Sequence, residues 1–320
     1  MPLRLGTRGS PLARWQAEWT AGELKARGVD VELVPITTSG DREQSGPIGA
    51  IGTQGVFTKE LQRALLDGSI DLAVHSLKDL PTEPVEGLVL AVVPERGPTG
   101  DCLVSPRFRT FDELPQGAIV GTGSQRRRAQ LLYARRDLKM EDVRGNVDTR
   151  LRKLNEGQYA AIILAEAGLK RLKLEAHIAQ VLPTELILPA VGQGALGLET
   201  RVDDRTTRAH LAPLDHGPTH AAVTAERALL HALRGGCLAP VGAWGRHAAD
   251  GRLQLSAVVL RFDGSERLYT ELSGTELSGT ALVDTAAEAV ELGRRAAEEL
   301  LNRGAARLIA DSRGGSLSAP

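Results

Sequence analysis

The feature that most constrains the fold of this chain is a short motif that occurs twice, each time between an apolar strand and a helix. Gly-Thr-Arg-Gly-Ser at residues 6–10 separates a predicted strand over 3–6 from a predicted helix over 11–27. Gly-Thr-Gly-Ser at residues 121–124 lies between a second strand and a helix over 125–134. Backbone N–H groups, the helix dipole and hydroxyls converge at such a junction, which favours an anion. One such motif alone is better interpreted as an ordinary capped turn, but the repetition predicts two α/β lobes with a ligand in the cleft between them.

Length and periodicity extend this interpretation to more than one domain. The chain has 320 residues, and single hydrophobic cores stop growing near roughly 250 to 300 residues. The apolar, glycine-rich segment 186–198 is expected to cross between the lobes. Apolar periodicity predicts further strands over 31–36, 70–75, 141–144, 160–165, 253–260 and 308–310. It predicts further helices over 59–67, 149–156, 219–233 and 280–301.

Charge and cysteine usage exclude several classes of protein. Lys and Arg number 39 and Asp and Glu number 40, so the net charge of −1 gives no overall attraction to nucleic acid or an acidic membrane. The two cysteines, Cys102 and Cys237, fit a reducing compartment and form neither a disulfide framework nor a zinc motif. The N-terminus has no signal-peptide pattern, and no segment has the roughly 20 apolar residues of a membrane span. We expect a cytoplasmic protein without a bound metal.

The two cysteines have different surroundings. Cys237 directly follows Gly235 and Gly236, which permit a sharp turn that leaves the thiol exposed. It is therefore a candidate point of covalent attachment. Cys102 lies in a short apolar stretch and is expected to pack as a small core residue.

Arg126 to Arg128 lie in the first turn of the helix predicted after the second motif, where positive charge opposes the helix dipole. A bound carboxylate would compensate this charge, because a guanidinium matches two carboxylate oxygens. The alternative is a solvated basic face, the usual place of a run of charges. Arg144, Arg150 and Arg171, near predicted turns and strand ends, are candidates for the same anionic ligand.

Asp79 follows the predicted strand over 70–75, at the carboxyl edge where α/β sites gather. Its carboxylate is a candidate for stabilising a cation or accepting hydrogen bonds from a ligand. The alternative is a loop aspartate paired with Lys78. His75, inside the strand, is expected in the core or behind the site.

Seven segments of the chain together resemble one enzyme family. They are G-T-R-G-S-P-L-A-R-W-Q, A-V-H-S-L-K-D-L-P, G-T-G-S-Q-R-R-R-A-Q, R-G-N-V-D-T-R-L, A-I-I-L-A-E-A-G-L-K-R-L, L-P-A-V-G-Q-G-A-L-G and G-G-C-L-A-P, in the family's order between residues 4 and 240. By these motifs the chain resembles the hydroxymethylbilane synthases, also called porphobilinogen deaminases.

The resemblance implies an α/β fold of three domains. The first two look like the lobes of a type II periplasmic binding protein, and the third is a small α/β domain that carries the cofactor cysteine. The expected limits are 1–96 with 194–214 for the first lobe, 97–193 for the second and 215–320 for the C-terminal domain. A monomer is expected.

The resemblance also implies the chemistry. Cys237 would hold one dipyrromethane cofactor through a thioether. The enzyme would join four porphobilinogen molecules head to tail, release ammonia at each step and hydrolyse the product to hydroxymethylbilane. Each pyrrole bears an acetate and a propionate, so the growing chain needs many guanidiniums to neutralise it.

The family's functional residues carry over to named positions. Asp79 would be catalytic, because it would contact pyrrole N–H groups and stabilise the azafulvenium-like cation left when ammonia departs. The resemblance assigns cofactor binding, besides the thioether, to Ser76, Lys78, Asp79, Thr122, Ser124, Arg126, Arg127, Arg144 and Gly145. It assigns substrate binding to Arg8, Ser10, Arg144, Arg150, Arg171 and Gln193.

One segment departs from the family, and two other classes of function stay open on the residues alone. Lysines are expected at positions 50 and 54, where this chain has Ala50 and Gln54. A non-catalytic binding protein for a small polyanion would explain the arginines but not Cys237, and an intact mass would distinguish it. A nucleic-acid binder using residues 126–128 is disfavoured by the near-zero net charge and by the 3% aromatic content.

Overall fold

The computed structural model describes residues 1–38, 58–236, 239–274 and 282–314. By contacts between residues the chain divides into two compact units. Unit 1 comprises residues 1–97 and 194–220, and unit 2 comprises residues 98–193 and 221–320. Within the described ranges no helix combines the length and apolarity needed to pass through a bilayer.

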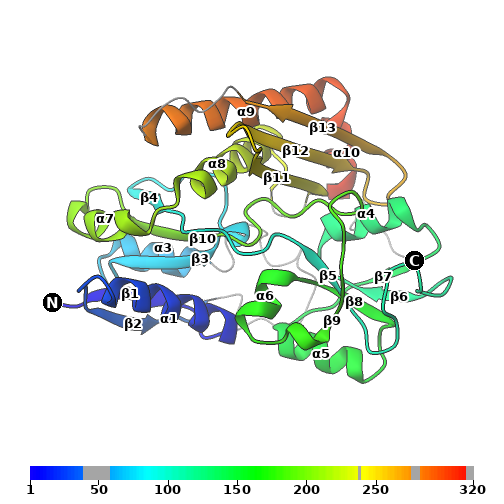
Figure 1. The fold of residues 1–320 in the computed structure, drawn as a ribbon, viewed down its shortest axis with the longest axis horizontal. Coiled ribbons are helices and arrows are strands. Elements are labelled where there is room, and N and C mark those ends of the chain that lie inside the picture. Colours follow the sequence, from blue (N-terminus) through cyan, green and yellow to red (C-terminus); the bar gives the residue numbers. More distant parts are fainter. Residues whose placement is uncertain (39–57, 237–238, 275–281, 315–320) are drawn as a thin grey trace. The chain divides into compact units, whose positions relative to one another are not determined.

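Unit 1 is built on a five-stranded sheet (Figure 1). In spatial order its strands are β2 (Val31–Pro35), β1 (Leu3–Thr7), β3 (Leu72–Ser76), β10 (Leu196–Arg201) and β4 (Leu88–Val92). β1 is parallel to both of its neighbours, whereas β10 is antiparallel to β3 and β4. A strand from late in the chain therefore completes a sheet that the N-terminal strands begin.

The helices of unit 1 cover both faces of this sheet, as the alternation of side chains in β3 shows. Leu72 and Val74 pack with α1 (Pro11–Lys25), α7 (Arg205–Leu211) and the 3₁₀ turn η4 (Ala212–Leu214). Ala73, on the opposite face, packs with α3 (Lys59–Leu66). Successive strand residues point to opposite faces, so Ser76 and His75 at the end of β3 are directed toward different helices.

The first sheet of unit 2 repeats the pattern of strand directions of unit 1 with a different chain order, because the antiparallel strand in the fourth place comes first in the chain here and last in unit 1. Its spatial order is β7 (Lys139–Glu141), β6 (Ile119–Gly121), β8 (Ala161–Ala165), β5 (Asp101–Val104) and β9 (Ile178–Val181). β6 is parallel to β7 and β8, and β5 is antiparallel to β8 and β9. The accompanying helices are α4 (Gln125–Ala134), α5 (Val147–Asn155), α6 (Glu166–Arg171) and the 3₁₀ turn η3 (Glu175–His177).

Each of the two repeated motifs requires its first glycine for close packing. A Cβ on Gly6 would collide with the Ile70 side chain, and a Cβ on Gly121 would lie 2.9 Å from the Tyr159 ring. The two glycines thus bring neighbouring apolar groups against the strand immediately before the turn to the helix.

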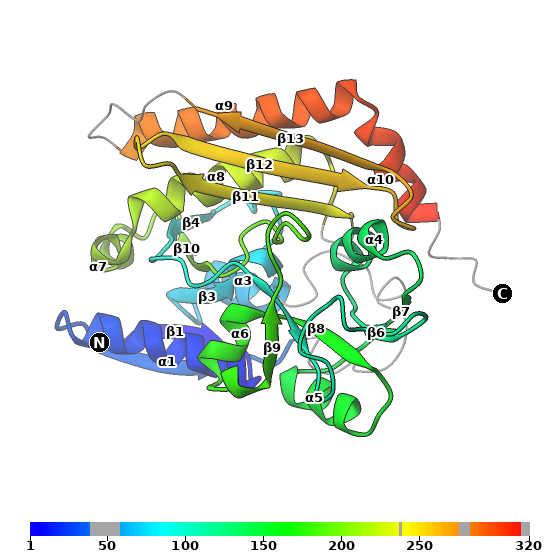
Figure 2. The same cartoon turned by 45° about the vertical axis from the view of Figure 1, so that its right-hand side comes forward.

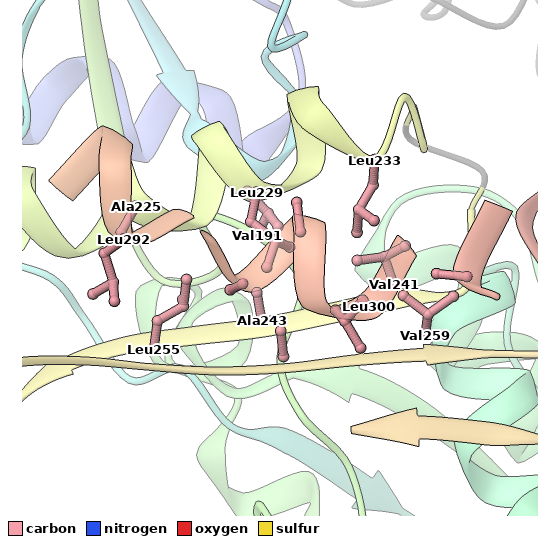
Figure 3. Packing of buried hydrophobic residues seen from close by; sticks show 14 of the residues in the cluster. Val191, Ala225, Leu229, Leu233, Val241, Ala243, Leu255, Val259, Leu292 and Leu300 are labelled. Carbon is pink, nitrogen blue, oxygen red and sulfur yellow. The ribbon is translucent and has the colours of Figure 1, made fainter. Parts of the chain in front are cut away.

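The rest of unit 2 is a three-stranded antiparallel sheet, which Figure 2 shows with its strands side by side. The strands are β11 (Val241–His247), β12 (Leu253–Leu260) and β13 (Arg267–Ser273), and the helices are α8 (Gly217–Ala232), α9 (Leu282–Asn302) and α10 (Ala305–Gly314). Figure 3 shows Leu229 of α8 and Leu292 and Leu300 of α9 in one apolar cluster over Ala243 and Leu255.

The opposite face of this small sheet is also covered. Val258 and Leu260 of β12 pack with Ala129 of α4 and with Leu188, and all four side chains are buried. The second five-stranded sheet and the C-terminal sheet therefore share an apolar interface within unit 2.

The expected α/β fold is confirmed, with two five-stranded sheets that share one pattern of strand directions and a small third sheet. The predicted helix over 125–134 matches α4 residue for residue, and the strand over 253–260 matches β12. The domain limits stay a prediction.

Three details of the secondary structure were wrong. The predicted strand over 308–310 is part of α10, because Ala305, Leu308 and Ile309 recur at helical spacing and are buried against the C-terminal sheet. The short strand expected over 141–144 ends at Glu141, where the chain leaves the sheet toward α5. The segment predicted to cross over 186–198 already enters β10 at Leu196.

Candidate functional site

Four residues predicted for the site line one pocket of unit 1, although they are far apart in the sequence. Arg8, Ser10, Ser76 and Asp79 border a volume of about 60 Å³ at the carboxyl ends of β1 and β3. One water needs about 10–15 Å³ of such space. The pocket therefore has room for a side group of a ligand rather than for a whole pyrrole with its substituents.

Local structure fixes these side chains in place. Ser10 is the N-cap of α1, and its hydroxyl accepts a hydrogen bond from the Ala13 amide at 3.3 Å. Ser76 ends β3, and its hydroxyl accepts a hydrogen bond from Gln16 Nε2 at 2.7 Å. Gln16 is itself buried in α1 and lines the pocket.

Asp79 lies in the 3₁₀ turn η2 (Leu77–Asp79), which directly continues β3. Its carboxylate lines the pocket and has no hydrogen bond or ion pair within the part of the chain that the structure describes. The alternative of a loop aspartate paired with Lys78 is wrong, because neighbouring side chains in a 3₁₀ turn point about 120° apart. The Asp79 oxygens are therefore open to a ligand.

A buried polar chain starts at His75, which lines the pocket, and continues on the α3 side of the sheet. His75 Nε2 is 3.0 Å from Glu199 Oε2, and Gln62 Nε2 donates to Glu199 Oε1 at 3.0 Å. All three side chains are buried. The expectation that His75 lies in the core or behind the site is confirmed.

In unit 2 the structure joins two predicted cofactor-binding arginines to a carboxylate of the chain itself. Arg126 Nη1 donates to Asp101 Oδ2 at 2.7 Å, and Arg127 Nε donates to Asp101 Oδ1 at 2.9 Å. Further bonds run from Arg126 to the Leu188 carbonyl and from Arg127 to the Ile163 carbonyl. We call Asp101, Arg126 and Arg127 the buried ion cluster.

The solvated basic face is therefore wrong for these two arginines. Arg126 and Arg127 are 4% and 6% exposed, and Asp101 is 1% exposed. Burial alone would raise the pKa of Asp101, yet the charges of Arg126 and Arg127 hold it well below its usual range. The carboxylate that offsets positive charge at the start of α4 comes from β5. A nucleic-acid interface through these side chains is excluded by the same burial.

The buried ion cluster still fits an additional carboxylate. Two guanidiniums and one carboxylate leave an excess of one positive charge in a buried place, which is costly unless an anion offsets it. Arg126 Nε is buried and has no hydrogen-bond partner within the described residues. An orphan guanidinium N–H beside excess positive charge is the donor that a carboxylate-bearing cofactor requires.

The neighbours of the buried ion cluster also belong to the predicted site. Gln193 Nε2 donates to Asp101 Oδ1 at 3.0 Å and to the Thr99 carbonyl at 2.7 Å, so its described contacts support the cluster. Ser124 caps α4 through the Arg127 amide, and the Thr122 hydroxyl accepts a bond from the Ser124 amide. Direct contact of Gln193, Thr122 and Ser124 with substrate or cofactor stays a prediction.

The remaining predicted arginines of unit 2 belong to two places in the fold. Arg144 and Arg150 lie before and within the start of α5, and Arg171 is the last residue of α6. Arg150 Nε donates to the Gly145 carbonyl at 2.8 Å, where Gly145 has a φ of 103°. Arg144 is half-buried beside this turn. Burial lowers the pKa of Arg171 to about 10.

The structure treats the two cysteines differently. Cys102 is buried in β5, which confirms the prediction of a small core residue, and burial raises the pKa of its thiol to about 12. Cys237 lies outside the described residues, as do Ala50 and Gln54. The turn before Cys237 does use backbone with positive φ, at Arg234 (49°) and Gly236 (62°).

Sequence reasoning missed several residues that now belong to the site. Asp101 begins an apolar strand, and an acidic residue directly before buried apolar residues is a signal for a paired charge. Also missed were Gln16 and Thr58, which line the pocket of unit 1, and Glu199, which bonds to His75. Gln16 lies four residues after Leu12 on α1 and could have been placed beside the first motif, whereas the partner strand of Glu199 was not predictable.

Comparison with known proteins agrees with these observations. The family description "Porphobilinogen deaminase, dipyromethane cofactor binding domain" matches residues 3–209, and "Porphobilinogen deaminase, C-terminal domain" matches residues 220–302. A porphobilinogen deaminase of Trichlorobacter lovleyi is 47% identical over 311 residues, covering 97% of this chain and 96% of the relative. One of Syntrophotalea carbinolica is 47% identical over 312 residues, covering 96% and 95%.

Solved structures of binding proteins are more distant. The methionine binding protein MetQ has a TM-score of 0.42 at 17% identity and covers 63% of this chain and 84% of its own. A nutrient binding protein from Burkholderia cenocepacia bound to methionine has a TM-score of 0.41 at 13% identity, covering 66% and 90%. Similarity at this level does not assign a family. The family assignment rests on the two near-full-length relatives and on the two domain matches. The chain belongs to the porphobilinogen deaminase family.

Proposed function

We propose that this protein is a transferase of tetrapyrrole biosynthesis that joins four porphobilinogen molecules head to tail. Ammonia leaves at each condensation, and hydrolysis releases the linear tetrapyrrole hydroxymethylbilane. The near-full-length relatives and both family matches support this activity. The structural observation that carries it is the open carboxylate of Asp79 in one pocket with Arg8, Ser10 and Ser76.

Asp79 is proposed to act on the porphobilinogen side chain from which ammonia departs. When the protonated amine leaves as ammonia, a positive charge develops on the pyrrole and its adjoining methylene. A fixed carboxylate beside that charge stabilises the transition state more than the ground state. A carboxylate already paired within the protein would do this poorly, and Asp79 has no such partner among the described residues.

Arg8 and Ser10 are proposed to hold carboxylates of the incoming pyrrole, and Arg144, Arg150 and Arg171 to hold those of the lengthening chain. Every added pyrrole brings two carboxylates. Burial lowers the pKa of Arg171, and the attraction between a guanidinium and a carboxylate is stronger in such less polar surroundings.

The cofactor is dipyrromethane, in agreement with the description of the matching domain. We propose that Arg126 and Arg127 hold its carboxylates, with Ser76, Lys78, Thr122, Ser124, Arg144 and Gly145 as further contacts, and that Cys237 holds it covalently. When bound, it supplies the nucleophilic pyrrole carbon on which the product chain grows. The chain's own residues bind its carboxylates and keep it oriented.

Intact mass and turnover together test the proposed function. Denatured wild-type protein should carry an adduct of dipyrromethane mass, and Cys237→Ser should carry none and form no product from porphobilinogen. Cys102→Ser is the matched control, because it removes the buried thiol, and it should keep the adduct. An unmodified wild-type Cys237 in active enzyme would contradict the attachment, and absence of turnover by adduct-bearing protein would contradict the activity.

We further propose that the enzyme works as a monomer in the cytoplasm, without a nucleic-acid partner. A reducing compartment keeps the Cys237 thiol available for thioether formation. Light scattering at several protein concentrations tests the oligomeric state, and a constant mass near 34.1 kDa is expected.

A further inference from the structure

Thr58 lines the pocket with a polar group that the proposed function does not use and that, unlike those of Gln16 and His75, has no partner among the described residues. It is 1% exposed, and its hydroxyl has no hydrogen-bond partner within the described residues. Thr58 lines the same pocket as Arg8 and Asp79. A buried hydroxyl without a partner costs free energy, so an orphan of this kind in a pocket marks a place for a polar ligand atom.

The backbone around Thr58 adds donors to this place. Thr58 is the N-cap of α3, but its side chain makes no capping bond. The first intrahelical bond of α3 runs from the Gln62 amide to the Thr58 carbonyl at 2.9 Å. Amides before that bond have no acceptor in their own helix, and the helix dipole places partial positive charge there. The start of α3 therefore favours an acceptor that carries negative charge.

The charges around the pocket indicate which group of the substrate, a carboxylate or the amine, binds beside Thr58. Arg8 and the start of α3 attract an anion, whereas Asp79 attracts N–H groups and developing positive charge. Glu60 in the first turn of α3 weakens an anion site, which keeps the expected effect moderate. His75 lines the pocket wall with its imidazole already bonded to Glu199. The volume of about 60 Å³ admits a carboxylate with its methylene.

We propose that the Thr58 hydroxyl and the first turn of α3 bind one carboxylate side chain of the incoming porphobilinogen. This subsite rests on the proposed function and extends it, since it assigns a second donor group to the carboxylate that Arg8 attracts. Thr58 donates its hydroxyl hydrogen to a carboxylate oxygen and thereby orients the pyrrole while Asp79 faces the departing amine.

Thr58→Val removes the hydroxyl and keeps the shape of the side chain. KM for porphobilinogen should rise about tenfold, a loss of about 1.4 kcal/mol of binding, while kcat changes less than twofold and the cofactor adduct keeps its mass. The thermal midpoint should rise, because the variant no longer buries an unpaired hydroxyl. Thr58→Ser should restore KM.

Thr200→Val is the matched control. The Thr200 hydroxyl is equally buried but donates to the Asp71 carbonyl at 2.7 Å. Its loss should lower the thermal midpoint and leave KM unchanged. The thermal midpoint should thus rise in Thr58→Val and fall in Thr200→Val. This difference distinguishes a hydroxyl kept for a ligand from one that only stabilises the fold.

Binding of unreactive analogues by calorimetry separates this subsite from the proposed function. An analogue with both carboxylates but no aminomethyl group should bind wild type about tenfold more tightly than Thr58→Val. Equal binding would overturn the subsite even if the enzyme is active. A difference confined to analogues that keep the amine would also overturn it, since Thr58 would then contact the leaving group. Carboxylate-dependent binding in protein without turnover would contradict only the activity.

Discussion

Two aspartates in similar α/β sheets have opposite surroundings. Asp101 in unit 2 is fully buried, and each of its oxygens accepts from a different arginine. Asp79 in unit 1 lies in a pocket and bonds to none of the described residues. The comparison teaches that one carboxylate holds two cations in place, whereas the other has no described partner, as the proposed stabilisation of a developing cation requires.

Asp101→Asn should produce the largest loss of stability. The substitution leaves two buried guanidiniums without an anionic partner, which costs about 3–5 kcal/mol when a buried pair is broken. Urea unfolding followed by circular dichroism measures it. Asp71→Asn is the control, because Asp71 also binds two arginines, Arg4 and Arg201, but at a more exposed place. An equal loss in both variants would contradict the role of burial.

Asp79→Asn should instead lower turnover and leave stability almost unchanged. Removing a preorganised charge at the reacting group typically costs about 10²–10³-fold in kcat, whereas the thermal midpoint should stay within about a degree because no described partner is lost. Steady-state turnover and a melting curve measure the two quantities. Product formation at the wild-type rate would show that Asp79 does not stabilise the developing cation.

Acid should weaken the protein through its paired aspartates Asp71 and Asp101. Burial opposes ionisation of Asp71, but hydrogen bonds from Arg4 and Arg201 hold its pKa at about 2, and the pKa of Asp101 is also well below its usual range. An unfolded aspartate has a pKa of about 3.9. The stabilisation is therefore complete above about pH 4 and is lost as pH falls through the folded pKa.

This acid dependence is measurable as the free energy of unfolding between about pH 4 and pH 2. The wild-type slope should exceed that of Asp71→Asn. A wild-type slope in Asp71→Asn would show that its ion pairs contribute nothing in this range.

The smallest expected effect concerns the two helix caps that the repeated motifs supply. Ser10→Ala and Ser124→Ala should each cost about 1 kcal/mol of stability. Ser124 should cost less, because its hydroxyl lies 3.5 Å from the capped amide and that of Ser10 lies 3.3 Å away. Thermal unfolding measures the loss of stability in each variant. A larger loss in Ser124→Ala would mean that the distance from hydroxyl to capped amide does not control the size of the loss.

The helix caps, the apolar spacing and the repeated glycine motif predicted those elements whose structure depends on neighbouring residues in the sequence. The cap at Ser124 and the apolar spacing after it located α4 to the residue, and the twice-repeated glycine motif predicted two lobes of one design. The pocket residues Ser10, Ser76 and Asp79 were predictable because each ends or begins a local element.

Features that depend on distant partners were not predictable. β10 lies between β3 and β4, and nothing in the sequence of residues 196–201 predicts these two neighbours. Asp101 and the arginines that it binds are about 25 residues apart in sequence, and a run of arginines is usually solvated. The short apolar run over 308–310 suits a strand or a buried helix equally well, and only its packing against the C-terminal sheet decides.

The position of β10 has a consequence for synthesis on the ribosome. β1, β2, β3 and β4 emerge first, but β3 and β4 become neighbours only through β10, which begins at Leu196. All five strands of the second sheet precede it in the chain. The second sheet of the nascent polypeptide can thus be complete while the first still has an open seam between β3 and β4, so the sheet that begins translation first closes after the one that follows it.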